Sequence, residues 1–202
     1  MSNKKDTKAA LNRGIFPVIV MVIVTVVCTG LLALTNGITT EARAEQKVKK
    51  VVENRQLLFP EAKEFKELDV KELLSADIDE KQVSALAEAK NEAGETIGYI
   101  AETNARGYGG AVNIMLAIGT NQKLVGLRIM DNSETAGLGK KVEGESFRSQ
   151  FKDLDATKRY TARSVEGKEQ IDAISGATIS SNAVAEAINV ALDLWQQAGG
   201  AH

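Results

Sequence analysis

The 202-residue sequence has almost no cysteine or histidine, the residues on which disulfides, histidine catalysis and Cys/His metal sites depend. It contains one cysteine, Cys28, and one histidine, His202, which is the last residue. These two cannot form a disulfide framework, a four-ligand Cys/His zinc site, an iron–sulfur cluster or a bis-histidine haem within the chain. The formal net charge of −2 argues against nucleic acid as a partner, because that needs a basic surface. What remains is chemistry on carboxylates, hydroxyls or a bound cofactor.

One long stretch of the chain has no charged residue. Residues 15–34 are apolar over 20 positions, which in a helix span about 30 Å, the thickness of the hydrocarbon core of a bilayer. We therefore predict a transmembrane helix over 15–34. The alternative is a cleavable signal peptide, because Ala42-Arg43-Ala44 resembles a cleavage site. The apolar run is longer than a signal peptide needs and ends eight residues earlier, which favours a retained anchor.

The charges beside the apolar stretch indicate its orientation. Arg13 lies directly before it, whereas residues 35–42 contain neither lysine nor arginine. Basic residues stay on the cytoplasmic side of a membrane helix. We therefore expect residues 1–14 to be a cytoplasmic N-terminus and residues 35–202 to lie outside.

The remaining sequence alternates between helical and strand periodicity, which predicts an α+β fold. Residues 35–82 are interpreted as a membrane-proximal helical segment, with a helix over 45–58 and no clear pattern over 61–80. Residues 83–202 are interpreted as one domain of antiparallel strands with packed helices. We predict a hairpin from 112–118 with 125–129, because apolar residues alternate around turn residues. Residues 83–90 fit a helix or a strand by pattern, and the turn residues 91–95 before the strand-like stretch 96–102 favour a second hairpin, from 83–90 with 96–102. Residues 131–144 are expected to be a loop, followed by helices at 146–151 and 181–197.

Three glycine-containing segments are candidates for a ligand site. They are Gly107-Tyr108-Gly109-Gly110, the segment from Glu134 to Lys140, and the segment from Asp172 to Asn182 before the last helix. Glycine lets the backbone approach a ligand closely or adopt positive φ. The hydroxyls of the third segment have two interpretations. Ser181 or a neighbour could cap the helix, or the turn could bind phosphate at the helix N-terminus.

The third segment carries a recognisable motif. Asp172-x-x-Ser175-Gly176-Ala177-Thr178 resembles the flavinylation motif of the FMN-binding domain family. The resemblance implies that the Thr178 hydroxyl is joined to the phosphate of FMN as a phosphodiester, made from FAD by a separate flavin transferase. The other two segments resemble the family's E-T-x-G-L-G and glycine–tyrosine segments. The resemblance therefore implies a cofactor site made of Thr178, Asp172, Ser175, Gly176, Ala177, Glu134, Thr135, Gly137, Leu138, Gly139 and Tyr108.

The order of the motifs and the single anchor are similar to those of the G subunits of Rnf (Rsx) electron-transport complexes. This resemblance implies an electron-carrying subunit, not catalytic alone, in an ion-translocating ferredoxin/NAD oxidoreductase. It implies a single-pass protein of the bacterial inner membrane, surrounded by lipid and by other subunits, with a periplasmic flavin domain. One alternative is the C subunit of the sodium-translocating NADH:quinone oxidoreductases, which is generally longer between anchor and flavin domain. Another is a non-redox anchored scaffold or solute-binding module.

Overall fold

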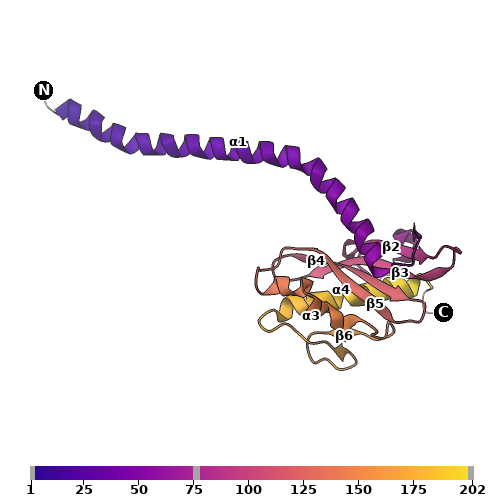
Figure 1. Cartoon of the computed structure of the whole chain (residues 1–202). Coiled ribbons are helices and arrows are strands. Elements are labelled where there is room, and N and C mark those ends of the chain that lie inside the picture. The colour runs from indigo at the N-terminus through magenta and orange to yellow at the C-terminus, as the bar shows by residue number, and fades with distance from the viewer. Residues whose placement is uncertain (1–2, 75–77, 200–202) are drawn as a thin grey trace. The chain divides into compact units, whose positions relative to one another are not determined.

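The computed structural model describes residues 3–74 and 78–199, with the side chains of 16–36, 46–74 and 78–199. The chain divides into two compact units, residues 1–50 and 51–202. The first unit consists of the greater part of helix α1 (Asn3–Leu58), and the last turns of this helix belong to the second unit (Figure 1). The flavin-domain boundary drawn at residue 83 stays a prediction.

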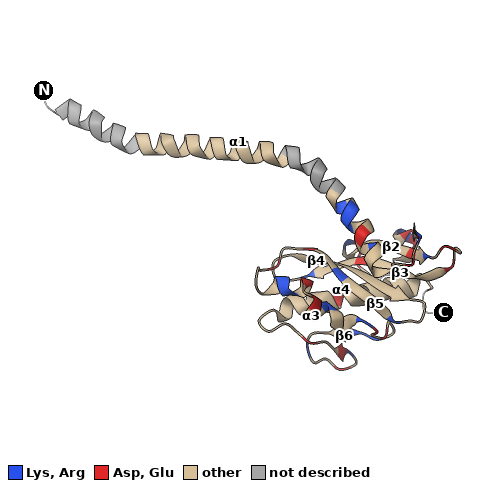
Figure 2. Cartoon of the chain, in the orientation of Figure 1, with Lys and Arg blue, Asp and Glu red and all other residues tan. Residues whose placement is uncertain are grey.

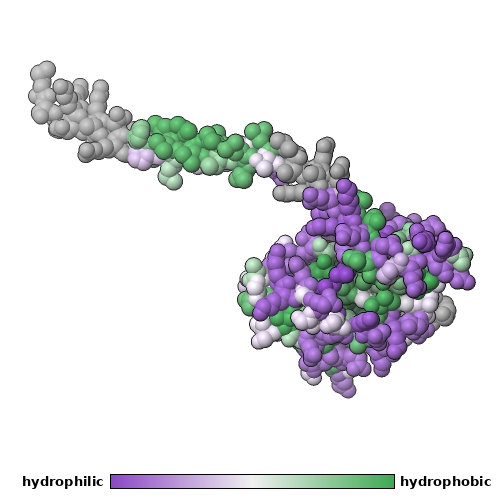
Figure 3. Space-filling view, in the orientation of Figure 1, coloured by the Kyte–Doolittle hydropathy of each residue, from purple (hydrophilic) through white to green (hydrophobic). Residues whose placement is uncertain are grey.

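Helix α1 contains a stretch, Phe16–Asn36, that is long and apolar enough to cross a membrane by its length and composition. Its side chains are exposed in the structure, and they form the continuous hydrophobic surface seen in Figure 3. The hydroxyls of Thr25 and Thr35 donate to the carbonyls of Met21 and Leu31, so these polar groups are satisfied within the helix. Figure 2 shows no charged residue along this stretch. The side chains of Arg13 and of Ala42-Arg43-Ala44 lie outside the described set.

The second unit is built on one antiparallel sheet whose five strands follow each other in chain order. The strands are β1 (Glu64–Glu67), β2 (Val83–Lys90), β3 (Thr96–Arg106), β4 (Ala111–Gly119) and β5 (Leu124–Asn132). The α+β prediction and both predicted hairpins are confirmed. The first hairpin is closed by Asn91, whose Oδ1 accepts from the backbone N–H groups of Ala93 and Glu95. Strand β3 continues four residues beyond the predicted end, to Arg106.

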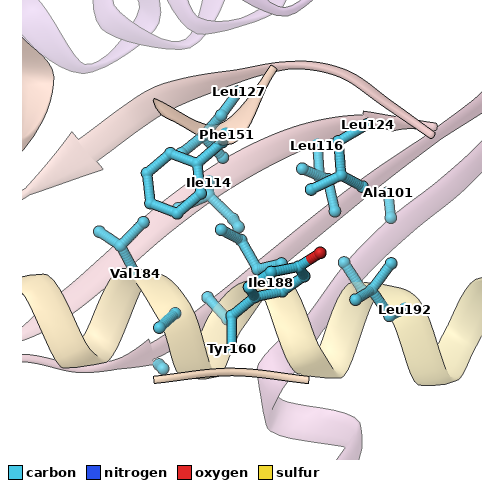
Figure 4. Close-up of a cluster of buried hydrophobic side chains, with 14 of the residues drawn as sticks. Ala101, Ile114, Leu116, Leu124, Leu127, Phe151, Tyr160, Val184, Ile188 and Leu192 are labelled. Carbon is cyan, nitrogen blue, oxygen red and sulfur yellow. The ribbon is translucent and has the colours of Figure 1, made fainter. Parts of the chain in front are cut away.

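Helix α4 (Thr178–Gln197) covers one face of the sheet, here called the front face. Side chains of β4 alternate between the two faces, so Ile114, Leu116 and Ile118 point toward α4. Figure 4 shows Val184, Ile188 and Leu192 of the helix packed against them, with Phe151 and Tyr160 completing the cluster. The predicted apolar face of the helix is thus buried, including Ala191 and Trp195.

The last turns of α1 pack on the opposite, back face of the sheet. Leu58 and the following Phe59 join Met115, Ala117 and Ile100 in a second buried cluster. Two glycines make room for them. A Cβ at Gly98 would collide with the Phe59 ring, and one at Gly126 would lie 3.1 Å from Leu58 Cδ2. The end of α1 is therefore an integral part of the domain, held by close packing against the sheet.

Short elements connect these layers. Residues 61–80, where the sequence has no clear pattern, contain β1, the helix α2 (Val70–Leu73) and the start of η1 (Glu80–Gln82). The predicted loop at 131–144 contains the 3-10 helix η2 (Gly139–Glu143). The predicted helix at 146–151 is divided into α3 (Glu145–Arg148) and η3 (Ser149–Phe151). Beyond these, β6 (Tyr160–Thr161) and β7 (Glu169–Gln170) form a small parallel pair.

Candidate functional site

A groove with a volume of about 550 Å³ lies at the first turn of α4. This volume falls in the range of small-molecule and cofactor sites. The groove brings together the three glycine-containing segments predicted from the sequence, although they are far apart in the chain. Its lining residues are Tyr108, Glu134, Thr135, Leu138, Gly139, Gly176, Ala177, Thr178, Ile179 and Ser180.

The groove presents large apolar side chains to solvent. Tyr108, Leu138 and Ile179 are 73%, 46% and 46% exposed, respectively, and come from three different segments. Exposed apolar side chains gathered around a concave surface are typical of a ligand site, because a bound ligand removes them from water. These side chains suit the faces of a flat, largely apolar ring system.

The start of α4 is open to a ligand. The N-cap residue is Ala177, which has no side-chain group to bond the helix N-terminus. Within the described part of the chain, the backbone N–H groups of Thr178, Ile179 and Ser180 have no acceptor. Free N–H groups and the helix dipole favour an anion such as phosphate at this position.

The interpretation of Ser181 as the N-cap is wrong. The helix begins at Thr178, so Ser181 lies inside it, and its hydroxyl donates to the Ala177 carbonyl at 3.1 Å. The same hydroxyl accepts from the backbone N–H of Ile174 at 3.0 Å. Ser181 therefore holds the turn before the helix, while the helix N-terminus itself remains uncapped.

The hydroxyls of this segment differ in what they are free to do. Those of Ser180 and Ser181 are buried, 2% and 0% exposed, and both are engaged in hydrogen bonds. Thr178 is exposed, lines the groove and has no hydrogen-bond partner among the described residues. Ser175 is also exposed but does not line the groove. Within this segment, Thr178 thus carries the groove-lining hydroxyl that is available for chemistry.

The turn before the helix is fixed by its backbone. Gly176 has φ of +77°, a conformation that costs an L-residue about 1–2 kcal/mol. At the other end of the turn, the side-chain amide of Gln150 binds the backbone N–H and C=O of Asp172 at 2.8 and 3.2 Å. The side chain of Asp172 is exposed, and neither Asp172 nor Gly137 lines the groove. Among the residues expected at the site, Asp172, Ser175 and Gly137 thus lie outside the groove lining.

Glu134 connects the three segments at the base of the groove. Glu134 is buried, with only 4% of the residue exposed. Oε1 accepts from the Gly109 N–H at 3.1 Å, and Oε2 accepts from the Ser180 hydroxyl at 2.6 Å. Asn132 Oδ1 in turn accepts from the Glu134 N–H at 3.0 Å. One carboxylate therefore fixes the Tyr108 segment and the first turn of α4 relative to each other.

Glycines surround this carboxylate because nothing larger fits. A Cβ at Gly107 would collide with Glu134 Oε1, and one at Gly109 with the Ser133 carbonyl oxygen. A Cβ at Gly139 would lie 2.5 Å from Glu134 Oε2 and 2.8 Å from Ser180 Oγ. Gly107 and Gly139 thus serve close packing around Glu134, and Gly109 leaves room for the backbone of Ser133.

Residues 107–193 match the model of the FMN-binding domain family. This range includes every residue that lines the groove. The chain is also similar to the G subunit of the ion-translocating oxidoreductase complex from Methanosarcina acetivorans, with 32% identity over 180 residues, covering 87% of this chain and 91% of that protein. The chain belongs to the G-subunit family of ion-translocating oxidoreductase complexes. The resemblance inferred from the motifs is therefore confirmed.

Two further proteins are similar to this chain. The G subunit of the Na(+)-translocating ferredoxin:NAD(+) oxidoreductase complex from Acetobacterium woodii is 28% identical over 199 residues, 95% of this chain and 94% of that protein. The crystal structure of the C subunit of Na(+)-translocating NADH-quinone reductase from Parabacteroides distasonis aligns with a TM-score of 0.46 and 24% identity. The alignment covers 56% of this chain and 60% of the P. distasonis chain. The G-subunit assignment rests on the sequence relatives, which match over most of this chain.

The groove of this G-family chain fits FMN, the cofactor of its domain family. The uncapped helix N-terminus suits the phosphate, and the apolar side chains suit the ring. The sequence reasoning missed Ile179 and Ser180, which line the groove. They follow Thr178 directly, so a helix beginning at Thr178 would have placed both in its first turn.

Proposed function

We propose that this chain is a membrane-anchored flavoprotein subunit that relays electrons through FMN attached covalently to Thr178, within an ion-translocating ferredoxin:NAD oxidoreductase complex. The observation that carries the proposal is the free hydroxyl of Thr178, exposed in the groove beside three unpaired N–H groups. The A. woodii relative, a subunit of a Na(+)-translocating ferredoxin:NAD(+) oxidoreductase complex, supports the reaction and the partner subunits.

For the attachment, this chain mainly has to position the Thr178 hydroxyl. The Thr178 oxygen forms a bond to the FMN phosphorus of FAD, the pyrophosphate P–O bond breaks, AMP leaves, and the hydroxyl proton is released. A separate flavin transferase supplies the catalysis. The free N–H groups of the first turn of α4 stabilise negative charge on the phosphate oxygens. Ser180 and Ser181 do not compete, because their hydroxyls are buried and already hydrogen-bonded.

Bound FMN supplies exchange of one or two electrons, so it can connect one-electron and two-electron carriers. This chain's residues hold and surround the ring. Tyr108, Leu138 and Ile179 line the groove and would cover the ring and exclude water, while Thr135, Gly139 and Ala177 complete the wall. Asp172, Ser175 and Gly176 shape the turn, and Gly137 shapes the loop that presents Leu138. No general acid or base is required.

The proposed location is the bacterial inner membrane, with one crossing and the flavin domain on the periplasmic side. The apolar stretch Phe16–Asn36 supports an anchor in lipid. Arg13 before it and the absence of lysine and arginine from residues 35–42 support the orientation. A covalent bond suits this location, because FMN released outside the cytoplasm would be lost by dilution.

The experiment that tests the function compares variants of the full-length chain made in membranes together with the flavin transferase. Intact mass and flavin fluorescence on a denaturing gel should show one FMN on the wild type and none on Thr178→Ala. Thr178→Ser should retain part of the adduct, because the hydroxyl oxygen survives. Ser175→Ala is the matched control, and its flavin content should equal that of the wild type. Covalent flavin on Thr178→Ala would refute the attachment site.

The same experiment should report how firmly the groove holds FMN without the bond. Glu134 is the one charged side chain among the described residues that line the groove, and it is negative. Thr178→Ala protein dialysed after exposure to free FMN should therefore be colourless. FMN retained by that variant at equal stoichiometry would show that the groove needs no covalent bond.

A further inference from the structure

The groove has an uncompensated acidic group at its base. Glu134 is 4% exposed, and no lysine or arginine forms an ion pair with it among the described residues. Its two oxygens accept hydrogen bonds from a backbone N–H and a hydroxyl, both neutral donors. Accepting through both oxygens is what an ionised carboxylate does. The charge is held in place by these donors and is not cancelled by a cation.

The lysines that follow this segment are in solvent. Lys140 and Lys141 follow Gly139 in η2, but both are exposed and neither lines the groove. Water and salt screen exposed charges much more than a buried one. The charged groups that line the groove itself are therefore Glu134 and the opposing helix N-terminus.

A fixed negative charge has a defined effect on a redox group. Reduction adds electrons, so the reduced form carries more negative charge or must take up a proton. A neighbouring carboxylate disfavours the reduced form relative to the oxidised one and lowers the midpoint potential.

From this geometry we propose that Glu134 sets the potential of the flavin, holding it below the value that the same groove would give without the charge. The inference rests on the proposed function, because it requires FMN on Thr178. The hydrogen bonds from Gly109 and Ser180 also keep the Glu134 charge at one position relative to the first turn of α4.

Glu134→Gln separates the charge from the geometry. Its amide oxygen accepts from the Gly109 N–H as before, and its amide nitrogen donates to the Ser180 hydroxyl, which rotates to accept. The side chain keeps its size, so the glycines around it remain in contact. A change in potential in this variant then reports the charge and not a rearranged groove.

The experiment is a redox titration of the full-length flavinylated protein in detergent at pH 8, with flavin loading measured separately by intact mass. At a fixed potential, Glu134→Gln should raise the ratio of reduced to oxidised flavin about tenfold, which corresponds to about 30 mV for a two-electron couple. Glu186→Gln is the control. Glu186 is an exposed carboxylate about two turns after Thr178 in α4, and it does not line the groove. Its ratio should equal that of the wild type.

An unchanged ratio in fully loaded Glu134→Gln, or an equal rise in Glu186→Gln, would overturn the inference. If Glu134→Gln takes up no flavin, Ser180→Ala decides. It keeps the charge and removes one of its two donors, so the reduced fraction should fall below that of the wild type, and a rise or no change would overturn the inference. Wild-type protein without flavin on Thr178 would instead refute the proposed function, and the inference with it.

Discussion

Gly139 is the position at which a single methyl group should disturb the groove. A Cβ there meets Glu134 Oε2, Glu134 Cβ and Ser180 Oγ at 2.5, 2.8 and 2.8 Å, so at least one of these groups must move. Overpacking of this kind costs about 1–3 kcal/mol. Gly139→Ala should therefore lower the free energy of unfolding and also shift the flavin absorbance maxima.

A glycine outside the groove provides the comparison for Gly139→Ala. Gly167 has φ of +78° and open space around its Cα, so Gly167→Ala should lower stability through backbone strain alone. Its flavin spectrum should match that of the wild type. Identical spectra for both variants would mean that Gly139 does not shape the cofactor site. Urea unfolding can be followed through Trp195, the single and fully buried tryptophan.

Tyr160 should titrate well above the usual pH range of a tyrosine. Burial raises the pKa of Tyr160 to about 12, and the nearby charges of Asp155 and Glu169 add to this effect. A tyrosine of the unfolded chain has a pKa near 10. The folded state thus holds the proton more tightly, and the stability that this gives is complete below about pH 10 and lost as the pH rises toward 12.

The measurement for Tyr160 is the rise of tyrosinate absorbance with pH in the full-length protein. The last phase, near pH 12, should be missing in Tyr160→Phe. Tyr108→Phe should leave that phase in place, since Tyr108 is exposed at the groove. A late phase that persists in Tyr160→Phe would show that another group causes it.

At the scale of elements, the end of α1 is fastened to the sheet by Arg55. Its guanidinium donates to Glu102 Oε1 from two nitrogens, at 3.1 and 2.7 Å, and to Glu67 Oε1 at 2.6 Å. The side chains of Arg55 and Glu102 are 11% and 16% exposed. Removing one partner of a buried pair leaves the other charge without compensation. Arg55→Ala should therefore lower the free energy of unfolding by about 3 kcal/mol.

Arg55→Ala is best measured against a surface ion pair. Lys158 and Glu169 are 4.0 Å apart and more than half exposed, so Lys158→Ala should change stability by less than about 1 kcal/mol. Arg55→Lys should fall between the two, because lysine keeps the charge and loses the fork of donors. Equal unfolding midpoints for Arg55→Ala and Lys158→Ala would show that α1 is not held by this contact.

The elements that the sequence predicted are those whose signal is local. The turn residues from Asn91 predict the first hairpin, and alternating apolar residues around Gly119 predict the second. The alternation arises because strands β4 and β5 have one face toward α4 and one toward the end of α1. Strand β1 has the sequence Glu-Phe-Lys-Glu and is mostly exposed. Its strand conformation comes from pairing with β2 at the sheet edge, so no apolar alternation marks it.

The sequence predicts the three motifs of the candidate site but not how they are arranged in space. The glycines and the threonine motif indicate where the chain meets a ligand, and the structure brings all three segments to one groove. The inward position of Glu134 depends on Gly109 and Ser180, which are 25 and 46 residues away from it. The side chain of Asp172 faces solvent, and Gln150 binds the backbone of Asp172. No sequence pattern predicts this contact.

For the whole molecule, the proposed topology has a direct test. Protease added to spheroplasts should digest the domain of residues 51–202 if it lies on the periplasmic side. N-terminal sequencing of untreated protein should find the residues before the apolar stretch, since an anchor is retained and a signal peptide is removed. A protected domain would reverse the orientation, and a mature chain beginning at Glu45 would exclude the anchor. A cytoplasmic protein of the same cells serves as the control for intact membranes.

The position of α4 in the chain has a consequence for the order of events during biogenesis. This helix follows all five strands of the main sheet, yet it covers the front face of that sheet and supplies Thr178, Ile179 and Ser180 to the groove. Until it has been synthesised, Ile114, Leu116 and Ile118 lack the helix that covers them on that face. The proposed acceptor, Thr178, is the first residue of the same helix. A chain whose synthesis stops before Thr178 lacks both the helix that covers the sheet and the acceptor hydroxyl. Covalent flavin would therefore be found only on molecules whose synthesis has passed Thr178.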